Sequence, residues 1–464
     1  MSKGGVRNLF FRCSRGLAAL AIAGASTLFG VQVMAIDVPR GIYSLGAAVN
    51  NPNTPQDERL SGIRTYDFVS GFTMRVFWSD LETSQGQYNF SVIDSAIQTL
   101  AATRRGLNLE IFTGEEPAYV LAGASATYID HRGGTNPVPW DAFAQQRHTA
   151  LFTALANHVV SGADSPHSLN QDSTLRSLDT SPVGLNFGVR DLNGGIRNHP
   201  DYTQQRYINA VADGVATVTA LFPNDTNSLA FFGFTDGTPG VPVDEQIITR
   251  LAPLYNGPGE PRLSFFIENL SDDGPVPLPS GSGTGANLVD WVSAGGDSMM
   301  QALDSWLQHQ PDREPQLDSH NAATGIALGY SNYGTRFFEL YVSDLDGANS
   351  GALDAAGRPI VDDLRAWNST LTSAITLPGD YNADGVVDGR DYVVWRDGLG
   401  GVVPLPNDAS VGVAADDYQR WRSYFGESVS GGVAQGAVPE QTTTISLLVA
   451  IAMHVGWYRR TQSS

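Results

Sequence analysis

The sequence has almost no cysteine. Cys13 is the only one among 464 residues, and it lies in an N-terminal segment that we expect to be cleaved. A mature chain without cysteine excludes disulfides, thiol catalysis and cysteine-based metal sites. A chain of this length buries enough apolar surface to fold without such cross-links.

Basic residues are also scarce. The chain carries 28 Lys and Arg against 48 Asp and Glu, which gives a formal net charge of −20. Nucleic acid binding requires a basic face, so this balance excludes nucleic acid as a partner. Such an acidic chain suits a soluble protein in an external medium, and its carboxylates suit calcium.

Several catalytic motifs are absent as well. The sequence contains no Gly-x-Ser-x-Gly elbow, no P-loop and no His-Glu-x-x-His motif. His131, His148 and His199 show no metal-ligand spacing. The chain therefore does not match these serine hydrolase, nucleotide-binding and zinc protease patterns.

The N-terminus has the three parts of a signal peptide. Residues 17–33 form an apolar stretch, and Val33-Met-Ala35 is a small-residue cleavage signal. The basic region before them consists of Lys3, Arg7, Arg12 and Arg15. We expect residues 1–35 to be removed on export. The alternative is a permanent membrane anchor.

From residue 41 onward, strand-like apolar runs alternate with helical patterns. The runs are residues 41–47, 72–78, 107–113, 183–189, 229–234, 263–268 and 337–342, and the helices are 91–102, 140–160, 202–222 and 358–371. This alternation implies parallel βαβ units with both faces of the sheet covered. Residues 36–375 are therefore predicted to form an α/β (β/α)8 barrel of the TIM type. The eighth strand is expected between Asn287 and Tyr330; an open doubly wound sheet is the alternative.

A calcium loop begins at Asp380. Oxygen ligands fall at positions 1, 3, 5, 7, 9 and 12 of an EF-hand loop, with Gly385 at position 6, where the chain must turn sharply. The ligand residues are Asp380, Asn382, Asp384, Val386 (through its backbone carbonyl), Asp388 and Asp391. Four close carboxylates would repel one another without a cation, so the segment predicts bound Ca²⁺.

The calcium loop and the helix start after it resemble a type I dockerin. Asp391-Tyr-Val-Val-Trp-Arg is echoed by Asp417-Tyr-Gln-Arg-Trp-Arg, the kind of internal repeat that dockerins contain. The resemblance covers residues 376–427 and implies a small all-α module that docks to a cohesin-type protein. A calcium-stabilised spacer is the alternative. The second loop has Pro406 at position 1 and Val411 at position 6, so we expect no well-formed ion site there.

A Ser- and Gly-rich linker, residues 428–437, leads to a tail that resembles a PEP-CTERM sorting signal. The tail, residues 438–464, has a Val-Pro-Glu motif, an apolar run over residues 445–457 and a basic end at Arg459 and Arg460. The resemblance implies a transient membrane anchor, a sorting or processing enzyme as partner, and a secreted or cell-envelope location. A C-terminal membrane or amphipathic helix is the alternative.

Part of the barrel region resembles clan A glycoside hydrolases. The matching elements are Arg75, Trp78, Gly86-Gln-Tyr-Asn-Phe90 and Asp94, together with Glu115-Glu-Pro117 and Val138-Pro-Trp-Asp141. The resemblance covers the first half of the barrel region. It implies hydrolysis of glycosidic bonds in a polysaccharide or oligosaccharide, with catalytic carboxyl groups at the C-terminal ends of the strands.

Two carboxyl groups are needed for that reaction. In the family the acid/base is a Glu after an Asn on the fourth strand, but this chain has no Asn-Glu dipeptide. Asp191 is the only carboxylate in the corresponding region and is the candidate proton donor. Glu339 is the candidate nucleophile, because a carboxylate in an apolar late strand is costly unless it faces a site or a partner. Glu268 competes for this role.

The resemblance also suggests groups that contact the substrate. Arg75, Trp78 and Glu268 are the candidate substrate-binding residues, and Trp140, Tyr119 and Tyr341 are further aromatic rings that could stack on sugars. The sequence thus predicts an exported carbohydrate-active protein. The missing Asn-Glu keeps open a non-catalytic surface protein that binds glycan or serves a structural role on the same barrel.

Overall fold

The computed structural model describes nineteen stretches of the chain. These are residues 39–48, 60, 63–114, 116–130, 133–161, 166–185, 195–223, 226–230, 238–256, 263–268, 270–272, 274–275, 284–308, 317, 319–372, 377–382, 387–400, 405–408 and 413–427. The predicted signal peptide, the linker after residue 427 and the sorting tail lie outside them. Every structural statement below concerns the described residues.

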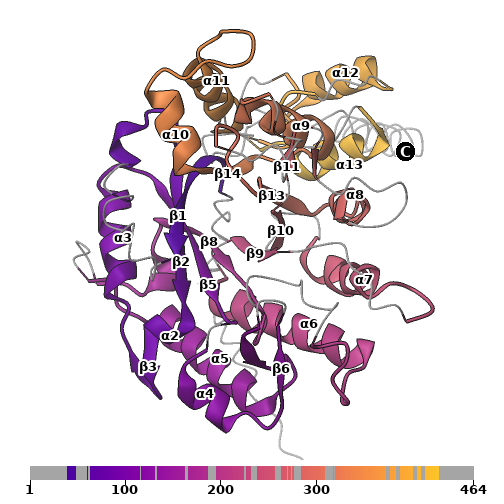
Figure 1. Ribbon diagram of the computed structural model, residues 1–464. Coiled ribbons are helices and arrows are strands. Elements are labelled where there is room, and N and C mark those ends of the chain that lie inside the picture. The colour runs from indigo at the N-terminus through magenta and orange to yellow at the C-terminus, as the bar shows by residue number, and fades with distance from the viewer. Residues whose placement is uncertain are drawn as a thin grey trace, which may run out of the picture. The chain divides into compact units, whose positions relative to one another are not determined.

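Eight parallel strands close into a barrel in sequence order (Figure 1). They are β1 (Gly41–Ala48), β2 (Gly71–Phe77), β5 (Gly106–Phe112), β8 (Leu175–Asp179), β9 (Thr226–Ala230), β10 (Leu263–Ile267), β13 (Asp297–Gln301) and β14 (Phe337–Tyr341). β1 pairs with both β2 and β14, which closes the ring. The predicted (β/α)8 architecture is confirmed, and the eighth strand is β13, within the interval where it was expected.

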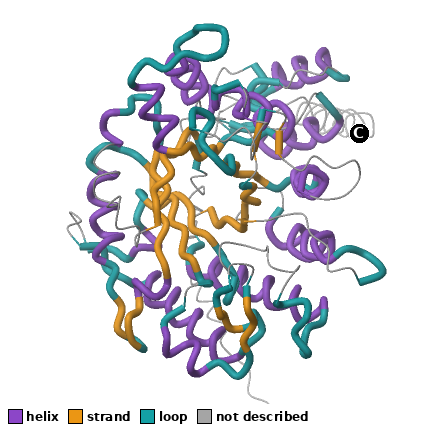
Figure 2. Tube along the Cα trace, in the orientation of Figure 1, coloured by secondary structure: helices purple, strands orange, loops and turns teal. Residues whose placement is uncertain are grey.

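Helices follow most of the strands and surround the barrel (Figure 2). The main ones are α3 (Ser91–Ala101), α5 (Ala142–Ala156), α6 (Gln204–Leu221), α7 (Val243–Tyr255), α8 (Thr284–Ser293), α9 (Ala322–Tyr333), α10 (Val342–Asn349) and α11 (Ile360–Thr372). Side-chain caps fix the starts of three of them, α5, α6 and α9. The Asp141 carboxylate accepts the Ala144 N–H before α5, and the Thr203 hydroxyl accepts the Arg206 N–H before α6.

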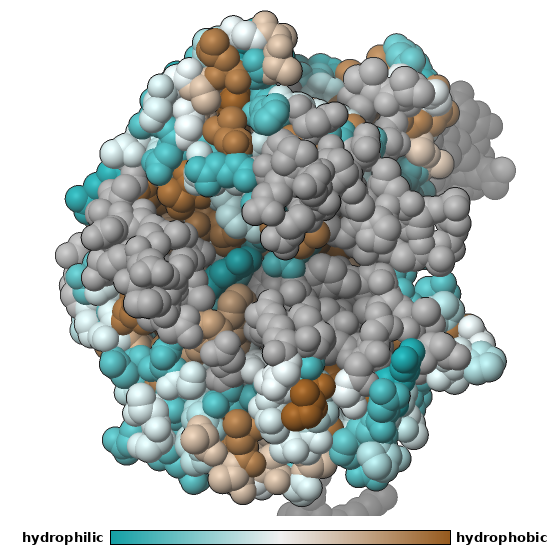
Figure 3. All heavy atoms as spheres, in the orientation of Figure 1, coloured by the Kyte–Doolittle hydropathy of each residue, from teal (hydrophilic) through white to brown (hydrophobic). Residues whose placement is uncertain are grey.

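Shorter elements connect the barrel units. They are the helices η1 (Ile63–Thr65), α2 (Trp78–Leu81), α4 (Ala118–Gly123) and η2 (Leu169–Gln171), and the hairpins β3–β4 (Glu82–Ser84, Gln87–Tyr88), β6–β7 (Thr127–Ile129, Thr135–Pro137) and β11–β12 (Leu270–Ser271, Gly274–Pro275). On the face shown in Figure 3, hydrophobic side chains form separate patches among hydrophilic ones. No described helix is both long and apolar enough to cross a membrane.

The fourth strand is not where the sequence pattern placed it. The apolar run from Val183 was predicted as a strand, but residues 181–185 have no strand structure, and β8 lies earlier, at Leu175–Asp179. The physical reason is that Val183 and Leu185 are buried as part of a loop. Thr113 Oγ1 holds this loop by donating to the Pro182 carbonyl at 2.7 Å. A run of apolar residues indicates that the segment is buried, and this segment is buried as a loop and not as a strand.

Aromatic and apolar side chains fill the N-terminal part of the barrel interior. Tyr43, Phe266, Met299 and Phe337 form a cluster separate from the core between strands and helices. Two strand-starting glycines make room for it: a Cβ on Gly71 would lie 2.1 Å from the Tyr43 ring, and one on Gly106 would lie 2.6 Å from its hydroxyl. The lower interior is therefore packed core, and the polar interior lies above it.

Two helices, α12 (Gly389–Gly398) and α13 (Ala415–Tyr424), form the described part of the C-terminal module. Asp388 caps α12, and Asp391 accepts the Asp388 N–H in return, which makes a capping box. In the second repeat Asp417 likewise accepts the N–H of Ala414, at 2.7 Å. The repeated Asp-Tyr-x-x-Trp-Arg sequence therefore marks two equivalent helix starts.

Candidate active site at the carboxyl ends of the strands

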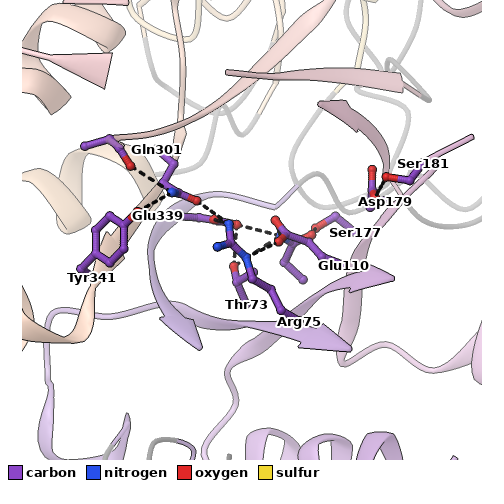
Figure 4. A network of polar contacts seen from close by, with 11 residues as sticks. Thr73, Arg75, Glu110, Ser177, Asp179, Ser181, Gln301, Glu339 and Tyr341 are labelled. Carbon is purple, nitrogen blue, oxygen red and sulfur yellow. Dashed lines mark hydrogen bonds and ion pairs between the residues drawn. The ribbon is translucent and has the colours of Figure 1, made fainter. Parts of the chain in front are cut away.

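Polar side chains occupy the barrel interior above the apolar cluster. Side chains alternate along a strand, so β2 directs Thr73 and Arg75 inward, and β5 directs Asn108 and Glu110 inward. The pairing register places Arg75 beside Glu110, and Gln301 of β13 beside Glu339 of β14. Residues from four strands thereby meet in one buried network (Figure 4).

Glu339 lies inside the barrel, with only 1% of its surface exposed. Its Oε1 accepts hydrogen bonds from Thr73 Oγ1 at 2.6 Å and from Asn108 Nδ2 at 2.8 Å. Asn108 is oriented in turn by Ser177, whose hydroxyl donates to Asn108 Oδ1 at 2.5 Å. The side chain that the sequence singled out as a nucleophile therefore faces the interior and not the outer helices.

Arg75 is the cation at the centre of this network. Its Nε donates to Glu110 Oε2 at 2.6 Å, its Nη2 donates to the Gln301 carboxamide oxygen at 2.7 Å, and Nη2 lies 3.9 Å from Glu339 Oε2. Burial lowers the pKa of Arg75, but the charges of Glu110, Glu339 and Glu268 raise it by more. The guanidinium therefore stays charged and compensates the surrounding carboxylates.

Glu110 and Glu339 form a coupled carboxylate pair. Burial raises the pKa of Glu110, and the charge and hydrogen bond of Arg75 oppose that effect. Burial also raises the pKa of Glu339 well above its usual range, and the negative charge of Glu110 adds to the increase. One cation serves two buried carboxyl groups, so their titration belongs to the pair and not to either residue alone.

Asp179 ends β8 and stands apart from the Arg75 contacts in Figure 4. Burial raises the pKa of Asp179 to about 8; a hydrogen bond from Ser181 opposes the shift and the charge of Glu110 contributes to it. The Ser181 hydroxyl donates to Oδ2. Among the described residues, Oδ1 has no hydrogen-bond partner. Asp179 is thus a protonated carboxylic acid at neutral pH with one free oxygen.

His148 of α5 supports Asp179 indirectly. Its Nε2 lies 3.1 Å from the Ser181 carbonyl, so this nitrogen carries the proton and donates it. Burial lowers the pKa of His148 to about 4, which keeps the imidazole neutral. The ring therefore positions the Ser181 backbone, and the Ser181 hydroxyl positions the Asp179 carboxyl group.

The other residues predicted for this site differ in where the structure places them. Asp191 lies outside the described residues. Glu268 follows β10, and its charge acts on Arg75 and Glu110, so it belongs to the same end of the barrel. Trp78 is a correction: it is 0% exposed, and its indole donates to Glu82 Oε2 at 2.9 Å. It therefore fixes the loop after β2 and presents no face to a sugar.

The remaining aromatic candidates are half-buried. Tyr341 lies at the end of β14, where its hydroxyl donates to the Leu303 carbonyl at 2.9 Å and accepts from Gln301. The Tyr119 hydroxyl accepts from Arg147 Nε at 3.2 Å, and Trp140 packs against His199 and Tyr202. Of these three, Tyr341 is the one joined by hydrogen bonds to the Arg75 network.

The calcium loop is described only in part, because Asp384 and Val386 fall outside the described residues. The Asp391 carboxylate accepts the N–H groups of Asn382 at 3.0 Å and Asp388 at 2.7 Å. Burial raises the pKa of Asp391, and the charges of Asp380 and Asp388 contribute to the increase. Within the described ranges, no group of three or more His, Cys, Asp or Glu side chains has metal-binding geometry.

Sequence reasoning missed Glu110, Asp179 and Gln301. Glu110 alternates with apolar residues on a strand that was recognised, so its inward position could have been read from the period of two. Asp179 was hidden because the fourth strand was placed eight residues too late at its start, at Val183 and not Leu175. Gln301 belongs to the strand whose limits the sequence left open.

Comparison with known proteins adds solved structures of the same architecture. The catalytic domain of beta-amylase from Paenibacillus polymyxa is similar at 10% identity and a TM-score of 0.45, over 72% of this chain and 98% of that one. Native xylanase 10B from Thermotoga maritima is similar at 9% identity and a TM-score of 0.41, over 73% and 98%. No family model and no curated protein matches the sequence. The strand order of the chain by itself establishes the (β/α)8 barrel.

Proposed function

We propose that the protein hydrolyses glycosidic bonds of a polysaccharide or oligosaccharide at the C-terminal end of its barrel. The observation that carries the proposal is that two buried carboxyl groups have different surroundings: burial raises the pKa of Asp179 to about 8, while Glu110 Oε2 accepts a hydrogen bond from the Arg75 guanidinium at 2.6 Å. Glycoside hydrolysis uses one protonated and one ionised carboxyl group on opposite sides of the bond.

Asp179 is the proposed proton donor. Its proton passes to the glycosidic oxygen as the bond from that oxygen to the anomeric carbon breaks, and a water molecule supplies the hydroxyl group of the new reducing end. A free Oδ1 among the described residues supports this role. Asp191, the donor favoured by the sequence, remains a second candidate for it.

The opposing group is the Glu110–Glu339 pair with its Arg75 counterion. Glu339 keeps the role of nucleophile or stabiliser, with Glu110 as the carboxylate that shares its charge. Glu268 and Tyr341 are proposed to contact the substrate, because they lie at the ends of neighbouring strands around this network. Replacing these carboxylates one at a time by the corresponding amide tests which role each of them has in the reaction.

The test is hydrolysis of a panel of polysaccharides by the mature protein and by single variants. Asp179→Asn and Glu339→Gln are expected to lose at least about 10²-fold of the rate. The exposed Asp290→Asn on α8 is the matched control and should keep full activity. Full activity of Asp179→Asn would eliminate it as the donor, and full activity of Glu339→Gln would eliminate the nucleophile.

A non-catalytic carbohydrate-binding barrel is the second candidate function. It is favoured by the deep burial of Glu110 and Glu339, each 1% exposed and each hydrogen-bonded to neighbouring side chains as a structural group would be. In this case calorimetry would detect binding of an oligosaccharide, and no new reducing ends would form. Binding accompanied by release of reducing ends rejects this candidate.

We further propose one Ca²⁺ bound by Asp380, Asn382, Asp384, the Val386 carbonyl, Asp388 and Asp391. The convergence of negative charge on the buried Asp391 supports this proposal, since a hard divalent cation would relieve it. Chelation should unfold the module, and readdition of calcium should restore it. A module whose helical signal is indifferent to chelator would refute the assignment.

Export, sorting and docking complete the proposal. Residues 1–35 act as a signal peptide, residues 438–464 act as a transient membrane anchor read by a processing enzyme, and the dockerin-like module recognises a cohesin-type protein. Mass spectrometry of protein secreted by a suitable bacterial host should find Ile36 as the first residue and a C-terminus before residue 445. An intact tail in the mature protein would contradict sorting.

A further inference from the structure

The two halves of the C-terminal module are held together by reciprocal contacts. The Trp395 indole of the first repeat donates to the Ala414 carbonyl at 2.7 Å, and the Trp421 indole of the second donates to the Asp388 carbonyl at 2.8 Å. Asp388 and Ala414 hold the same place, the residue before their helices. The halves can therefore be compared position by position.

The backbone repeats this reciprocity. The Gly400 N–H donates to the Val413 carbonyl, and the Gly426 N–H donates to the Val387 carbonyl, both at 2.8 Å. Each contact joins the second residue after the end of one helix to the second residue before the start of the other. The described ends of the two loops thus have the same backbone frame.

The second loop lacks the ligand set of the first. Pro406 stands where the first loop has Asp380, and Ala414 stands where it has Asp388. Neither offers a side-chain oxygen, so two of the carboxylates that calcium would need are missing. The residues of the second loop do not fit the ion, although one buried acidic side chain remains at its third position.

That side chain is Asp408, which is 5% exposed, and it contacts the guanidinium of Arg420 from α13. The position equivalent to Arg420 in the first repeat is Val394, which carries no charge. The positive charge of Arg420 therefore lies against the buried carboxylate at the third position of the second loop.

We propose that the Arg420 guanidinium takes the place of a calcium ion in the second loop. A buried carboxylate needs a countercharge. Guanidinium remains charged at any working pH and binds carboxylate through directional hydrogen bonds. The module would then bind a single Ca²⁺, at the first loop, while the second loop keeps its shape through a cation built into the chain. The stoichiometry rests on the calcium site proposed above; the role of Arg420 does not.

The stoichiometry is measured by titrating CaCl₂ calorimetrically into the full chain after removal of metal with a chelator. We expect one ion per chain, abolished by the double variant Asp380→Asn/Asp391→Asn and retained by Asp408→Asn. Two ions per chain, or loss of binding in Asp408→Asn, would overturn the inference. No binding at all would refute the first-loop calcium site and leave the Arg420 contact to the second experiment.

The second experiment is hydrogen exchange of the full chain with calcium present, followed by mass spectrometry of peptides from residues 405–427. Arg420→Met should lower protection there by at least about tenfold, because it removes the guanidinium that pairs with the buried Asp408 carboxylate. Adding Asp408→Asn to this variant should restore most of the protection. Arg422→Met, at an exposed arginine of the same helix, is the control. Wild-type protection in Arg420→Met, or no recovery in the double variant, would overturn the proposed role.

Discussion

Arg75 Nε lies 2.6 Å from Glu110 Oε2 inside the barrel, and the side chain of Arg75 is 15% exposed. The pair is the main charge compensation for the carboxylates of the interior. Arg75→Met should therefore lower the free energy of unfolding by about 3–5 kcal/mol at neutral pH. Urea unfolding measures this effect.

Two variants serve as controls for that prediction, and the first removes the charge of the partner, Glu110. Arg75→Met/Glu110→Gln should recover part of the loss, because it removes one of the unpaired anions. Arg64→Met, at an exposed arginine, should stay within about 0.5 kcal/mol of the wild type. An Arg75→Met variant as stable as the control would show that the ion pair does not stabilise the fold.

The raised pKa of Asp179 makes stability depend on pH. The unfolded carboxyl titrates near 3.9, and the folded one titrates at about 8. Between these values the native state binds one proton more than the unfolded state, so unfolding becomes easier as pH rises, by up to about 1.4 kcal/mol per pH unit. Asp179→Asn removes this contribution and should gain stability relative to the wild type from about pH 5 to about pH 8. The measurement is the free energy of unfolding of both proteins against pH. Two parallel curves would contradict the raised pKa of Asp179.

If Asp179 donates the proton, activity should fall as pH rises through about 8, because the acid must be protonated to act. The hydrogen bond from Ser181 lowers the pKa of Asp179, so Ser181→Ala should move the alkaline limb of kcat/KM to higher pH. The measurement is the pH dependence of kcat/KM for both proteins. If the alkaline limb of kcat/KM lies at the same pH in both proteins, ionisation of Asp179 does not cause it.

Trp78 distinguishes a core role from a sugar-stacking role. Trp78→Ala should lower the free energy of unfolding by about 3–5 kcal/mol, since it leaves a cavity and removes the donor to buried Glu82. Trp78→Phe should cost less because it keeps most of the volume. Urea unfolding of both variants tests this. A normal stability with weakened oligosaccharide binding would support the stacking role instead.

The reciprocal indole contacts of the module predict matched effects. Trp395→Phe and Trp421→Phe should each lower the stability of the calcium-loaded module by about 1 kcal/mol, because each removes one hydrogen bond to an equivalent carbonyl. Differential scanning calorimetry of the module transition checks this, with the exposed Arg396→Met as control. A large loss in only one of the two variants would contradict the equivalence of the halves.

The sequence could predict much of the barrel because its signals are local. Alternating strand and helix patterns, the burial of Glu339 in an apolar strand, and the inward place of Arg75 all follow from residues near one another in the chain. The fourth strand could not be located in this way. Both the Leu175 run and the Val183 run are buried, and only packing against Thr113 decides that the second forms a loop.

By itself the sequence favoured the (β/α)8 class over an open sheet, and it determined the spacing of a calcium loop and the repeat that follows it. Each depends on the order of residue types along the chain. Only the tertiary structure decided which carboxyl groups act on one another. Glu110, Asp179 and Glu339 come from three strands far apart in sequence; burial raises the pKa of all three, and one arginine opposes the shift of Glu110 and Glu339. Electrostatic energies depend on distance in space, which linear spacing does not contain.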